Sequence, residues 1–303
     1  MADFSKGAAW IKGEIIPISE ATINVTDWGF THSDATYDVA PVWDGAFFRL
    51  DAYLDRFEAS CASLRFDHGV DRETLRAALH AMVAKTGLSR AYVAMVASRG
   101  VPLIPGTRDP RQCGNHCFAW CVPYVHVIPE DVAARGARLW IAKGVHRIPD
   151  TSVAATVKNY HWGDFTMGLF EAKDRDYDTT ILADQNGNLT EGPGFNIFAV
   201  RGNTVVTPER HCLHGITRRT VMEIAEENGF TVEARDLPVT EAMEADELFT
   251  ATPGGGPVPV VMLDDRTFSN GAEGQVTRHL RETYWQWLKR PDFYEPVRLQ
   301  PTP

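Results

Sequence analysis

The sequence predicts an α+β (α/β) fold of two domains, a small α/β N-terminal domain and a larger, strand-rich C-terminal domain. Strand patterns precede helix patterns in the first 121 residues, and strand patterns dominate from residue 131 onward. The 303 residues, 44% of them hydrophobic, are enough for two moderate cores. Pro123 and Pro129 bound a stretch that crosses between the two patterns. We therefore expect domains at residues 1–121 and 131–303, joined by a linker at residues 122–130.

Turn and capping residues predict the elements of the first domain. Lys12-Gly13 and Asp44-Gly45 are typical of hairpin turns, and Asp-Gly is the stronger signal. We expect Asp51 to cap a helix and Gly87 to end a second one. The predicted ranges are 10–17 and 42–50 for the hairpins, 51–64 and 72–85 for the helices, and 91–97 for a strand.

Runs of β-branched and aromatic residues predict the strands of the second domain. The predicted strands are 138–142, 179–183, 195–200, 204–206, 231–234 and 247–250, and helices are expected at 217–228 and 274–289. The last stretch, residues 291–303, contains four prolines and is expected to form a surface tail.

Composition excludes several classes of partner. The formal net charge is −10 and the pI is about 5.5, so nonspecific binding to nucleic acid or to an anionic membrane has no electrostatic support. The start of the chain, Met1 to Lys6, shows no targeting pattern, and no run is apolar enough to span a membrane. We therefore expect a cytoplasmic protein. Its five cysteines are expected to be reduced thiols.

A metal site is the alternative interpretation of one cysteine cluster. Cys113, Cys117 and Cys121 recur every four residues beside His116, which on a helix would place them on one face. The surrounding residues are typical of a strand, however, where we expect the cysteines to be scattered over both faces. Buried free thiols are therefore the preferred interpretation, and no metal is expected.

Lys158 is the candidate for a nucleophilic amine. Its neighbours from Val153 to Trp162 are mostly apolar or aromatic. Burial in such surroundings disfavours the charged ammonium and would lower the pKa of the lysine toward the reactive range. A solvated surface lysine is the alternative that the local sequence leaves open.

Three further segments offer a carboxylate and two turns that suit an anion. Glu191 lies at the end of a hairpin that enters an apolar strand. Thr217 follows Gly215 at the start of a helix, where backbone N–H groups bind phosphate, although capping by Thr217 is the ordinary alternative. Thr252 begins a glycine-rich loop that suits a nest of amides. With Lys158, these groups match the needs of a phosphorylated pyridine aldehyde.

These residues, in this order, resemble the fold type IV pyridoxal-phosphate enzymes over nearly the whole chain. That family comprises the class IV aminotransferases, with a D-amino acid aminotransferase-like fold. Arg56, in the segment from Arg49 to Phe57, matches the arginine that holds the cofactor phosphate, although Tyr53 stands where a histidine is more usual.

The resemblance implies a cofactor, pyridoxal 5′-phosphate, and a role for each matching residue. It implies that Lys158 is the catalytic residue, carries the cofactor as a Schiff base and shuttles a proton during transfer. It implies that Glu191 keeps the pyridine nitrogen protonated. The remaining cofactor-binding residues would be Leu213 against the ring, and Ile216, Thr217 and Thr252 around the phosphate.

Within that family, two segments are most similar to the (R)-selective amine transaminases. These are the residues around Lys158 and the segment from Gly29 to Val39, which places His32 and Tyr37 at the substrate pocket. Ala94 departs from this pattern, because those enzymes often carry an acidic residue there. Arg108, in the loop expected to overhang the pocket, is our candidate contact for the carboxylate of the keto acid, with a solvated loop arginine near Asp109 as the alternative.

The activity implied is amino transfer from a small amine or amino acid to a keto acid such as pyruvate. Branched-chain and D-amino acid aminotransferases are the alternatives, followed by aminodeoxychorismate lyase and, last, a binding protein without activity. The loop after Ser98 lacks the Arg-x-His pair with which D-amino acid enzymes bind a carboxylate. The resemblance also implies a homodimer with shared active sites.

Overall fold

The computed structural model describes residues 4–298, which form two compact units. The first unit contains residues up to 125 together with 157–161 and the C-terminal residues from 288. The second contains residues 126–156 and 162–287. The segments 157–161 and 288–298 thus belong with the first unit although they lie within the predicted second domain. The predicted domain boundaries stay a prediction, and each unit is described by itself.

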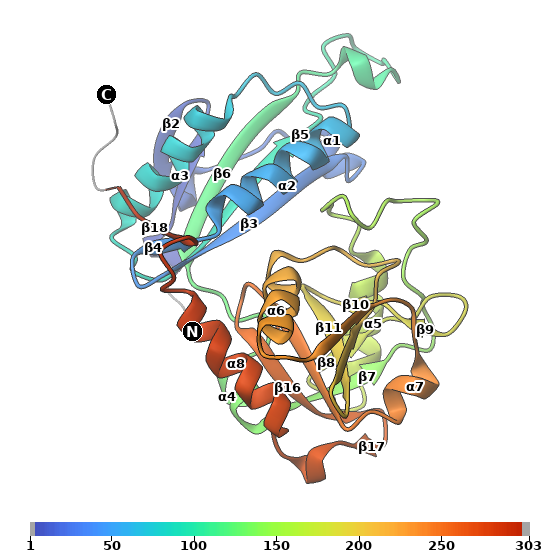
Figure 1. Cartoon of the computed structure of the whole chain (residues 1–303). Helices are drawn as coiled ribbons and strands as arrows, with labels where there is room; N and C mark the ends of the chain where they lie inside the picture. The colour runs from blue at the N-terminus through green and yellow to red at the C-terminus, as the bar shows by residue number, and fades with distance from the viewer. Residues whose placement is uncertain (1–3, 299–303) are drawn as a thin grey trace. The chain divides into compact units, whose positions relative to one another are not determined.

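The first unit is built on a seven-stranded antiparallel sheet in the order β18-β4-β3-β5-β6-β1-β2. Helices α2 and α3 pack on this sheet (Figure 1). The strands are β1 (Ala8–Ile11), β2 (Glu14–Pro17), β3 (Ala35–Trp43), β4 (Ala46–Phe48), β5 (Ala91–Ser98), β6 (His116–Pro123) and β18 (Tyr294–Pro296). The helices are α1 (Trp28–Thr31), α2 (Leu50–Ser63) and α3 (Arg72–Thr86), with short 3₁₀ turns at Phe4–Lys6, Ile18–Glu20 and Pro110–Gln112.

Both predicted hairpins are confirmed. Lys12 and Gly13 join β1 to β2, and Asp44 and Gly45 join β3 to β4. All four residues have positive φ angles, as a two-residue turn that matches the twist of its strands requires. Glycine and aspartate tolerate this conformation at little cost.

Helix α3 follows its sequence signals, whereas α2 departs from them. Asp71 caps α3 by accepting a hydrogen bond from the N–H of Thr74 at 2.8 Å, and Gly87 ends it with a φ of 67°. The prediction that Asp51 caps α2 is wrong. The N-cap is Arg49, and Asp51 lies in the first turn, where its carboxylate accepts hydrogen bonds from Arg72 and Arg76 of α3. A contact between two helices therefore replaces the local cap.

The predicted surface tail is wrong for the part of it that the structure describes. Residues Tyr294–Pro296 form β18, which pairs with β4. Glu295 accepts a hydrogen bond from Arg76 at 2.6 Å and contacts Nε2 of His80 at 2.9 Å. These contacts, which sequence separation hides, add an edge strand to the sheet. The rest of the predicted tail, from residue 299, lies outside the described residues.

The second unit contains a nine-stranded mixed sheet whose main path is β13-β12-β11-β15-β16-β7-β8. Its strands are β7 (Ala137–Ile141), β8 (Thr179–Ile181), β10 (Glu191–Gly192), β11 (Phe195–Arg201), β12 (Thr204–Thr207), β13 (Thr231–Ala234), β15 (Glu247–Thr252), β16 (Gly256–Leu263) and β17 (Arg266–Thr267), and a separate pair is formed by β9 (Asn188–Leu189) and β14 (Leu237–Pro238). The helices are α4 (Glu130–Arg135), α5 (Gly163–Lys173), α6 (Ile216–Glu227), α7 (Val239–Met243) and α8 (Gln275–Trp287), with a 3₁₀ turn at Ser269–Gly271.

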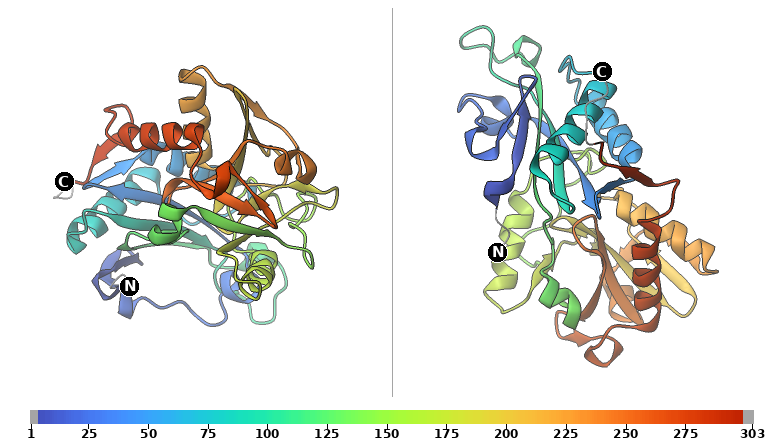
Figure 2. Two further views of the ribbon diagram at one scale, coloured as in Figure 1. Left: turned by 90° about the horizontal axis from the view of Figure 1, so that it is seen from below. Right: turned by 90° about the vertical axis from the view of Figure 1, so that its left-hand side faces the viewer.

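Helices and sheet of the second unit enclose an apolar core. Helices α6 and α8 pack against each other and on β15 and β16 (Figure 2), while α5 packs on β7 and β8. Leu139, Ile197, Leu248 and Val260, all within 2% of full burial, belong to the apolar cluster of this unit. The six predicted strands and two predicted helices of this region are all present, with ends shifted by a few residues at most.

Strand β16 lies outside the predicted strands, because Pro257 and Pro259 interrupt its sequence and proline cannot donate to a ladder. In the structure both prolines pair with β15 on one side only, since pairing with β7 on the other side begins at Val260. The prolines therefore lie where the strand still lacks a second neighbour.

The cysteines lie where a strand places them. Cys117 and Cys121 are on β6, but they share one buried face, because a spacing of four preserves the period of two. The expectation that they occupy both faces is wrong. All five cysteines are buried, reduced thiols, and residues 4–298 contain no group of three or more potential ligands that could hold a metal ion. Burial raises the pKa of the Cys117 thiol to about 12.

No helix within residues 4–298 is both long and apolar enough to cross a membrane. The cytoplasmic location stays a prediction.

Candidate active site

The lysine segment is attached to β3 of the first unit through its backbone. The N–H of Tyr37 and the hydroxyl of Thr36 both donate to the carbonyl oxygen of Lys158, at 3.2 and 2.6 Å. Thr36 and Asn159 also form an isolated bridge. The position of the Lys158 main chain is therefore determined by β3, more than a hundred residues earlier in the chain.

Aromatic rings surround the amine of Lys158. Its side chain is half-buried, and Nζ lies 4.5 Å from the centroid of the Tyr37 ring. Tyr37 stacks on Tyr160 with ring centroids 4.2 Å apart. Beside them lies an apolar cluster on β3, β5 and β6, made of Tyr37, Val39, Ala94 and Val96, with Tyr92, Phe118 and Trp120 packed against it. Burial raises the pKa of the Tyr160 and Tyr92 hydroxyls, so both stay neutral and protonated in the physiological range.

Arg56 projects from α2 toward β3, where Asp38 holds it. Nε and Nη2 of Arg56 donate to the two carboxylate oxygens of Asp38 at 2.8 and 2.7 Å. Asp38 is fully buried, and the Arg56 side chain is 13% exposed. Burial by itself would lower the pKa of Arg56, but the charge and hydrogen bonds of Asp38 raise it. The guanidinium is therefore a permanent cation with a defined orientation.

His32 and Arg108, the predicted pocket residues on loops of the first unit, are both exposed. His32 ends α1, where Nδ1 lies 2.7 Å from the Thr31 hydroxyl and its ring packs on Trp28. Arg108 forms no ion pair with any residue in 4–298. Its neighbour Asp109 is instead bound by Arg111, at 2.6 Å, and not by Arg108.

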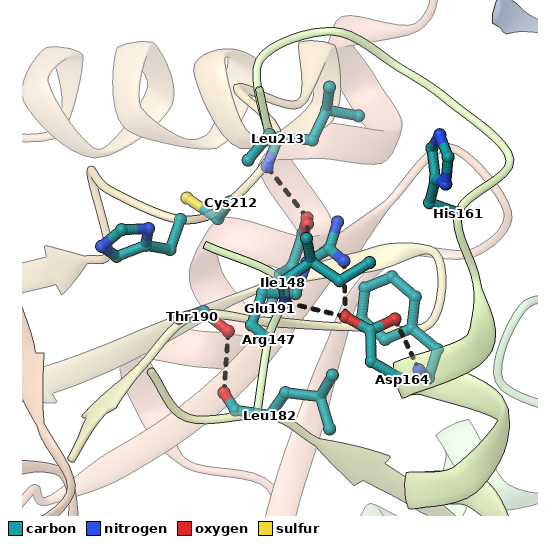
Figure 3. Close-up of polar contacts among 12 residues, drawn as sticks. Arg147, Ile148, His161, Asp164, Leu182, Thr190, Glu191, Cys212 and Leu213 are labelled. Carbon is teal, nitrogen blue, oxygen red and sulfur yellow. Dashed lines mark hydrogen bonds and ion pairs between the residues drawn. The ribbon is translucent and has the colours of Figure 1, made fainter. Parts of the chain in front are cut away.

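Glu191 is the centre of a polar network in the second unit (Figure 3). One carboxylate oxygen accepts from the N–H of Leu213 at 3.0 Å, and the other accepts from Nε of Arg147 at 3.1 Å. The hairpin turn brings Glu191 to this position because Leu182 pairs with it and with Thr190. Glu191 is thus buried, and donors hold both of its oxygens.

Arg147 and Asp164 belong to this network, although no sequence pattern indicated either residue. Nη1 of Arg147 donates to Asp164 at 2.7 Å, and the guanidinium also lies 4.4 Å from the centroid of the Phe165 ring. Burial alone would lower the pKa of Arg147, but the charges of Glu191 and Asp164 outweigh this effect and raise it. A charged pattern on a helix face or strand could have revealed such a residue, but Arg147 lies in a loop.

The start of α6 presents backbone donors with no side-chain cap. Gly215 occupies the N-cap position, where a Cβ would collide with Oδ1 of Asn196, so no capping side chain fits. Thr217 therefore does not cap this helix, and the ordinary alternative for this residue is wrong. Its side chain is 2% exposed, and Oγ1 finds no hydrogen-bond partner among residues 4–298. Ile216 and Thr217 thus offer N–H groups and a hydroxyl to an anion.

Thr252 ends β15 in the same unit. Its Oγ1 accepts a hydrogen bond from the N–H of Gly254 at 3.2 Å, which shapes the glycine-rich turn. The residue is fully buried.

These observations fit the expected cofactor. The orphaned Thr217 hydroxyl and the uncapped α6 suit a phosphate, and a buried carboxylate with fixed donors suits a ring nitrogen that carries a proton. The structure brings Lys158 together with Tyr37, and Glu191 together with Leu213. Lys158 and Arg56 belong to the first unit, whereas Glu191, Leu213, Ile216, Thr217 and Thr252 belong to the second.

Comparison with known proteins agrees with this assignment. The family model for the amino-transferase class IV family matches residues 35–261. A relative from Methanocaldococcus jannaschii, whose name provisionally calls it a branched-chain-amino-acid aminotransferase, is 29% identical over 278 residues, 91% of this chain and 94% of its own. A D-alanine aminotransferase from Listeria innocua is 24% identical over 295 residues, 92% of this chain and 96% of its own.

A solved structure extends the likeness to three dimensions. It is a branched-chain amino acid aminotransferase from the organism abbreviated T.th., complexed with N-(5′-phosphopyridoxyl)-L-glutamate, and it superposes with a TM-score of 0.87 at 25% identity. The match covers 96% of this chain and 99% of the other. The predicted fold class is therefore confirmed.

Proposed function

Since the chain belongs to the class IV aminotransferases and is therefore a pyridoxal-phosphate-dependent aminotransferase, we propose that its donors are (R)-configured amines and its acceptor a keto acid such as pyruvate. The observation that carries this proposal is the aromatic surface beside Lys158, formed by the stacked Tyr37 and Tyr160. The apolar cluster that adjoins it contains no charged side chain. Such a surface suits the uncharged organic group of an amine.

The cofactor ring would be held by Lys158, Glu191 and Leu213. Pyridoxal phosphate, when bound, supplies an electron sink. We assign Lys158 to its covalent attachment through Nζ and to the transfer of a proton from the carbon that bears the amino group. We assign Glu191 to holding the proton on the ring nitrogen and Leu213 to packing on the ring.

The phosphate would be bound by one arginine and the anion-binding turns. Arg56 supplies a fixed cation, because Asp38 orients its guanidinium. Ile216 and Thr217 supply the first N–H groups of α6, and Thr217 also supplies its hydroxyl. Thr252 supplies the end of β15 and the turn that follows. Charge-assisted hydrogen bonds of this kind are the strong ones in a protein.

The acceptor carboxylate would be bound by Arg108. A transaminase that accepts both amines and keto acids must admit an uncharged group in one half-reaction and a carboxylate in the other, and a fixed buried cation would be costly during the first. The exposed position of Arg108, and the pairing of Asp109 with Arg111, leave this side chain without a fixed partner ion among residues 4–298. It is therefore suited to approach the site only when an anion is present.

Branched-chain amino acids are the second candidate donors. The relatives with the names of branched-chain aminotransferases support this alternative, and an apolar cluster beside Lys158 also suits an aliphatic side chain. The D-alanine aminotransferase relatives support D-amino acids in the same way.

A half-reaction screen separates these candidates. The yellow enzyme, loaded with pyridoxal phosphate, is mixed separately with (R)- and (S)-1-phenylethylamine, D- and L-alanine, and L-leucine, and loss of the visible cofactor absorption is followed. We expect (R)-1-phenylethylamine to bleach the enzyme fastest. Fast bleaching by L-leucine alone would replace the amine proposal with the branched-chain one, and by D-alanine alone with the D-amino acid one.

A further inference from the structure

We propose that Asp164 and Arg147 are positioning residues that close the base of the lysine-bearing segment and attach it to Glu191. The proposal rests on the proposed roles of Lys158 and Glu191. It adds two residues that neither the sequence nor the family match assigned, and it connects the start and end of one segment to the carboxylate that would hold the ring nitrogen.

Asp164 joins the two ends of the segment that contains Lys158. Its Oδ2 accepts a hydrogen bond from the N–H of Ile148 at 3.0 Å and another from Nη1 of Arg147 at 2.7 Å. Its Oδ1 accepts from the N–H of Phe165 at 2.8 Å, at the start of α5. Residues 148 and 164, sixteen positions apart, are therefore held by one carboxylate (Figure 3).

Arg147 extends this closure to Glu191. Its Nε donates to Glu191 while its Nη1 donates to Asp164, so one guanidinium bridges the two acids. The side chains of Arg147, Asp164 and Glu191 are each 6–8% exposed. One cation between two buried carboxylates leaves one net negative charge, which suits a partner that carries a proton.

Between its ends the segment is only partly buried. Thr151, Ser152, Ala154 and Thr156 all lie open to solvent, and the N–H of Ala155 donates to Asp150 within the segment itself. Where few contacts hold the middle of a loop, the closure of its ends decides how many conformations it samples. Removal of the Asp164 carboxylate should therefore loosen this segment before it affects the rest of the second unit.

Two substitutions at Asp164 separate charge from closure. Asp164→Ala removes every acceptor of the side chain. Asp164→Asn keeps a carbonyl acceptor for the N–H of Ile148 but removes the charge, so that Arg147 acts on Glu191 alone. Glu171 provides a matched control, because it lies on the same helix and accepts from the N–H groups of Lys143 and Gly144 at 2.9 and 2.8 Å without contact to this network.

The first experiment measures cleavage of the holoenzyme by chymotrypsin at Tyr160 and Trp162, which are 37% and 36% exposed. We expect Asp164→Ala to speed cleavage at these two sites by about ten- to a hundredfold, the effect of one lost charge-assisted contact, while Glu171→Ala matches the parent. Unchanged cleavage in Asp164→Ala, or equal acceleration at buried aromatic sites such as Phe198, would overturn the proposal.

The second experiment reports on Glu191 and holds even where Asp164→Ala fails to fold. Enzyme loaded with pyridoxal phosphate labelled with ¹⁵N in the ring is titrated by NMR. In Asp164→Asn we expect the ring nitrogen to lose its proton about one pH unit lower than in the parent, because an undivided Arg147 charge opposes that proton. Glu171→Gln should leave it unchanged. An unchanged titration in Asp164→Asn overturns the proposal.

Failure of the proposed function would look different. If Lys158→Ala keeps the visible cofactor absorption, or Glu191→Gln leaves the ring-nitrogen titration unchanged, the assigned roles of those residues fail, whatever the Asp164 variants show.

Discussion

The Oε1 atom of Glu191 lies 3.1 Å from Nε of Arg147, and both side chains are 8% exposed. A buried carboxylate that meets a guanidinium stays ionised, because removal of its proton is favoured by the neighbouring charge. The second oxygen of Glu191 accepts from the backbone of Leu213. The orientation of the carboxylate is thus determined by one side chain and one main-chain donor, before any ligand binds.

Lys158→Ala should abolish transamination and covalent cofactor binding while the fold survives. The lysine is held through its backbone carbonyl oxygen, which alanine keeps, so β3 and the segment should stay in place. Visible absorbance near 400 nm (roughly, from cofactor chemistry) and amine turnover are measured, with the exposed Lys173→Ala as control. Full activity in Lys158→Ala would reject the assignment.

Glu191→Gln should retain much of the cofactor binding yet lose about a hundredfold or more in rate, the scale of one removed electrostatic contact in a catalytic site. A neutral amide does not hold a proton on the ring nitrogen. The rate of a single half-reaction and the dissociation constant for pyridoxal phosphate are compared with those of Glu226→Gln, an exposed position on α6. A rate equal to that of the parent would show that Glu191 is only a turn residue.

Arg108→Ala should raise the Michaelis constant for pyruvate by roughly ten- to a hundredfold, which corresponds to one charge-assisted contact of about 1.5–3 kcal/mol. The amine half-reaction should change little, because it contains no carboxylate to bind. Arg111→Ala is the matched control in the same loop, since Arg111 is paired with Asp109. Equal effects on both half-reactions, or no effect on pyruvate, would contradict the proposed role.

Glu295→Gln should destabilise the protein at neutral pH, with a difference that disappears in acid. The hydrogen bond with His80 and the charge of Arg76 lower the pKa of Glu295 below its ordinary value of 4.5. Such a group adds stability above its ordinary pKa, and this stability is lost as the pH falls through the lowered value. We expect a decrease of about 1 kcal/mol at pH 7, because Glu295 is only partly buried.

Urea unfolding of the parent and of Glu295→Gln at pH 7 and at pH 3 measures this effect. The two proteins should converge at the lower pH. A difference that stays constant between the two pH values would show that the contact of β18 does not depend on the charge of Glu295.

We propose that the active enzyme is a homodimer with shared active sites. Sedimentation at the working concentration, together with an activity assay on the same sample, measures the assembly. A fully active monomer would contradict this proposal. Exposed apolar side chains on the first unit, such as Val25, Phe30 and Leu103, are consistent with a protein surface that another chain covers.

Much of the fold could be predicted from the sequence because its signals are local. The Asp44-Gly45 turn depends on the backbone conformation of two adjacent residues, and α3 depends on Asp71 and Gly87 at its ends. The candidates Lys158 and Glu191 could likewise be selected from neighbouring residues and from the order of the family motifs. Their roles stay predictions, because the assignment depends on a cofactor and substrate and not on the chain alone.

Tertiary structure decided the contacts between residues far apart in sequence. Asp51 does not cap α2, because arginines of α3 compete for its carboxylate. The residues expected to form a tail pair with β4, because Glu295 meets Arg76 and His80 only after the helices have packed. Arg147 meets Asp164 and Glu191 in the same way. Local propensity is a property of a few adjacent residues, whereas the energy of a buried charge depends on which groups the completed fold places around it.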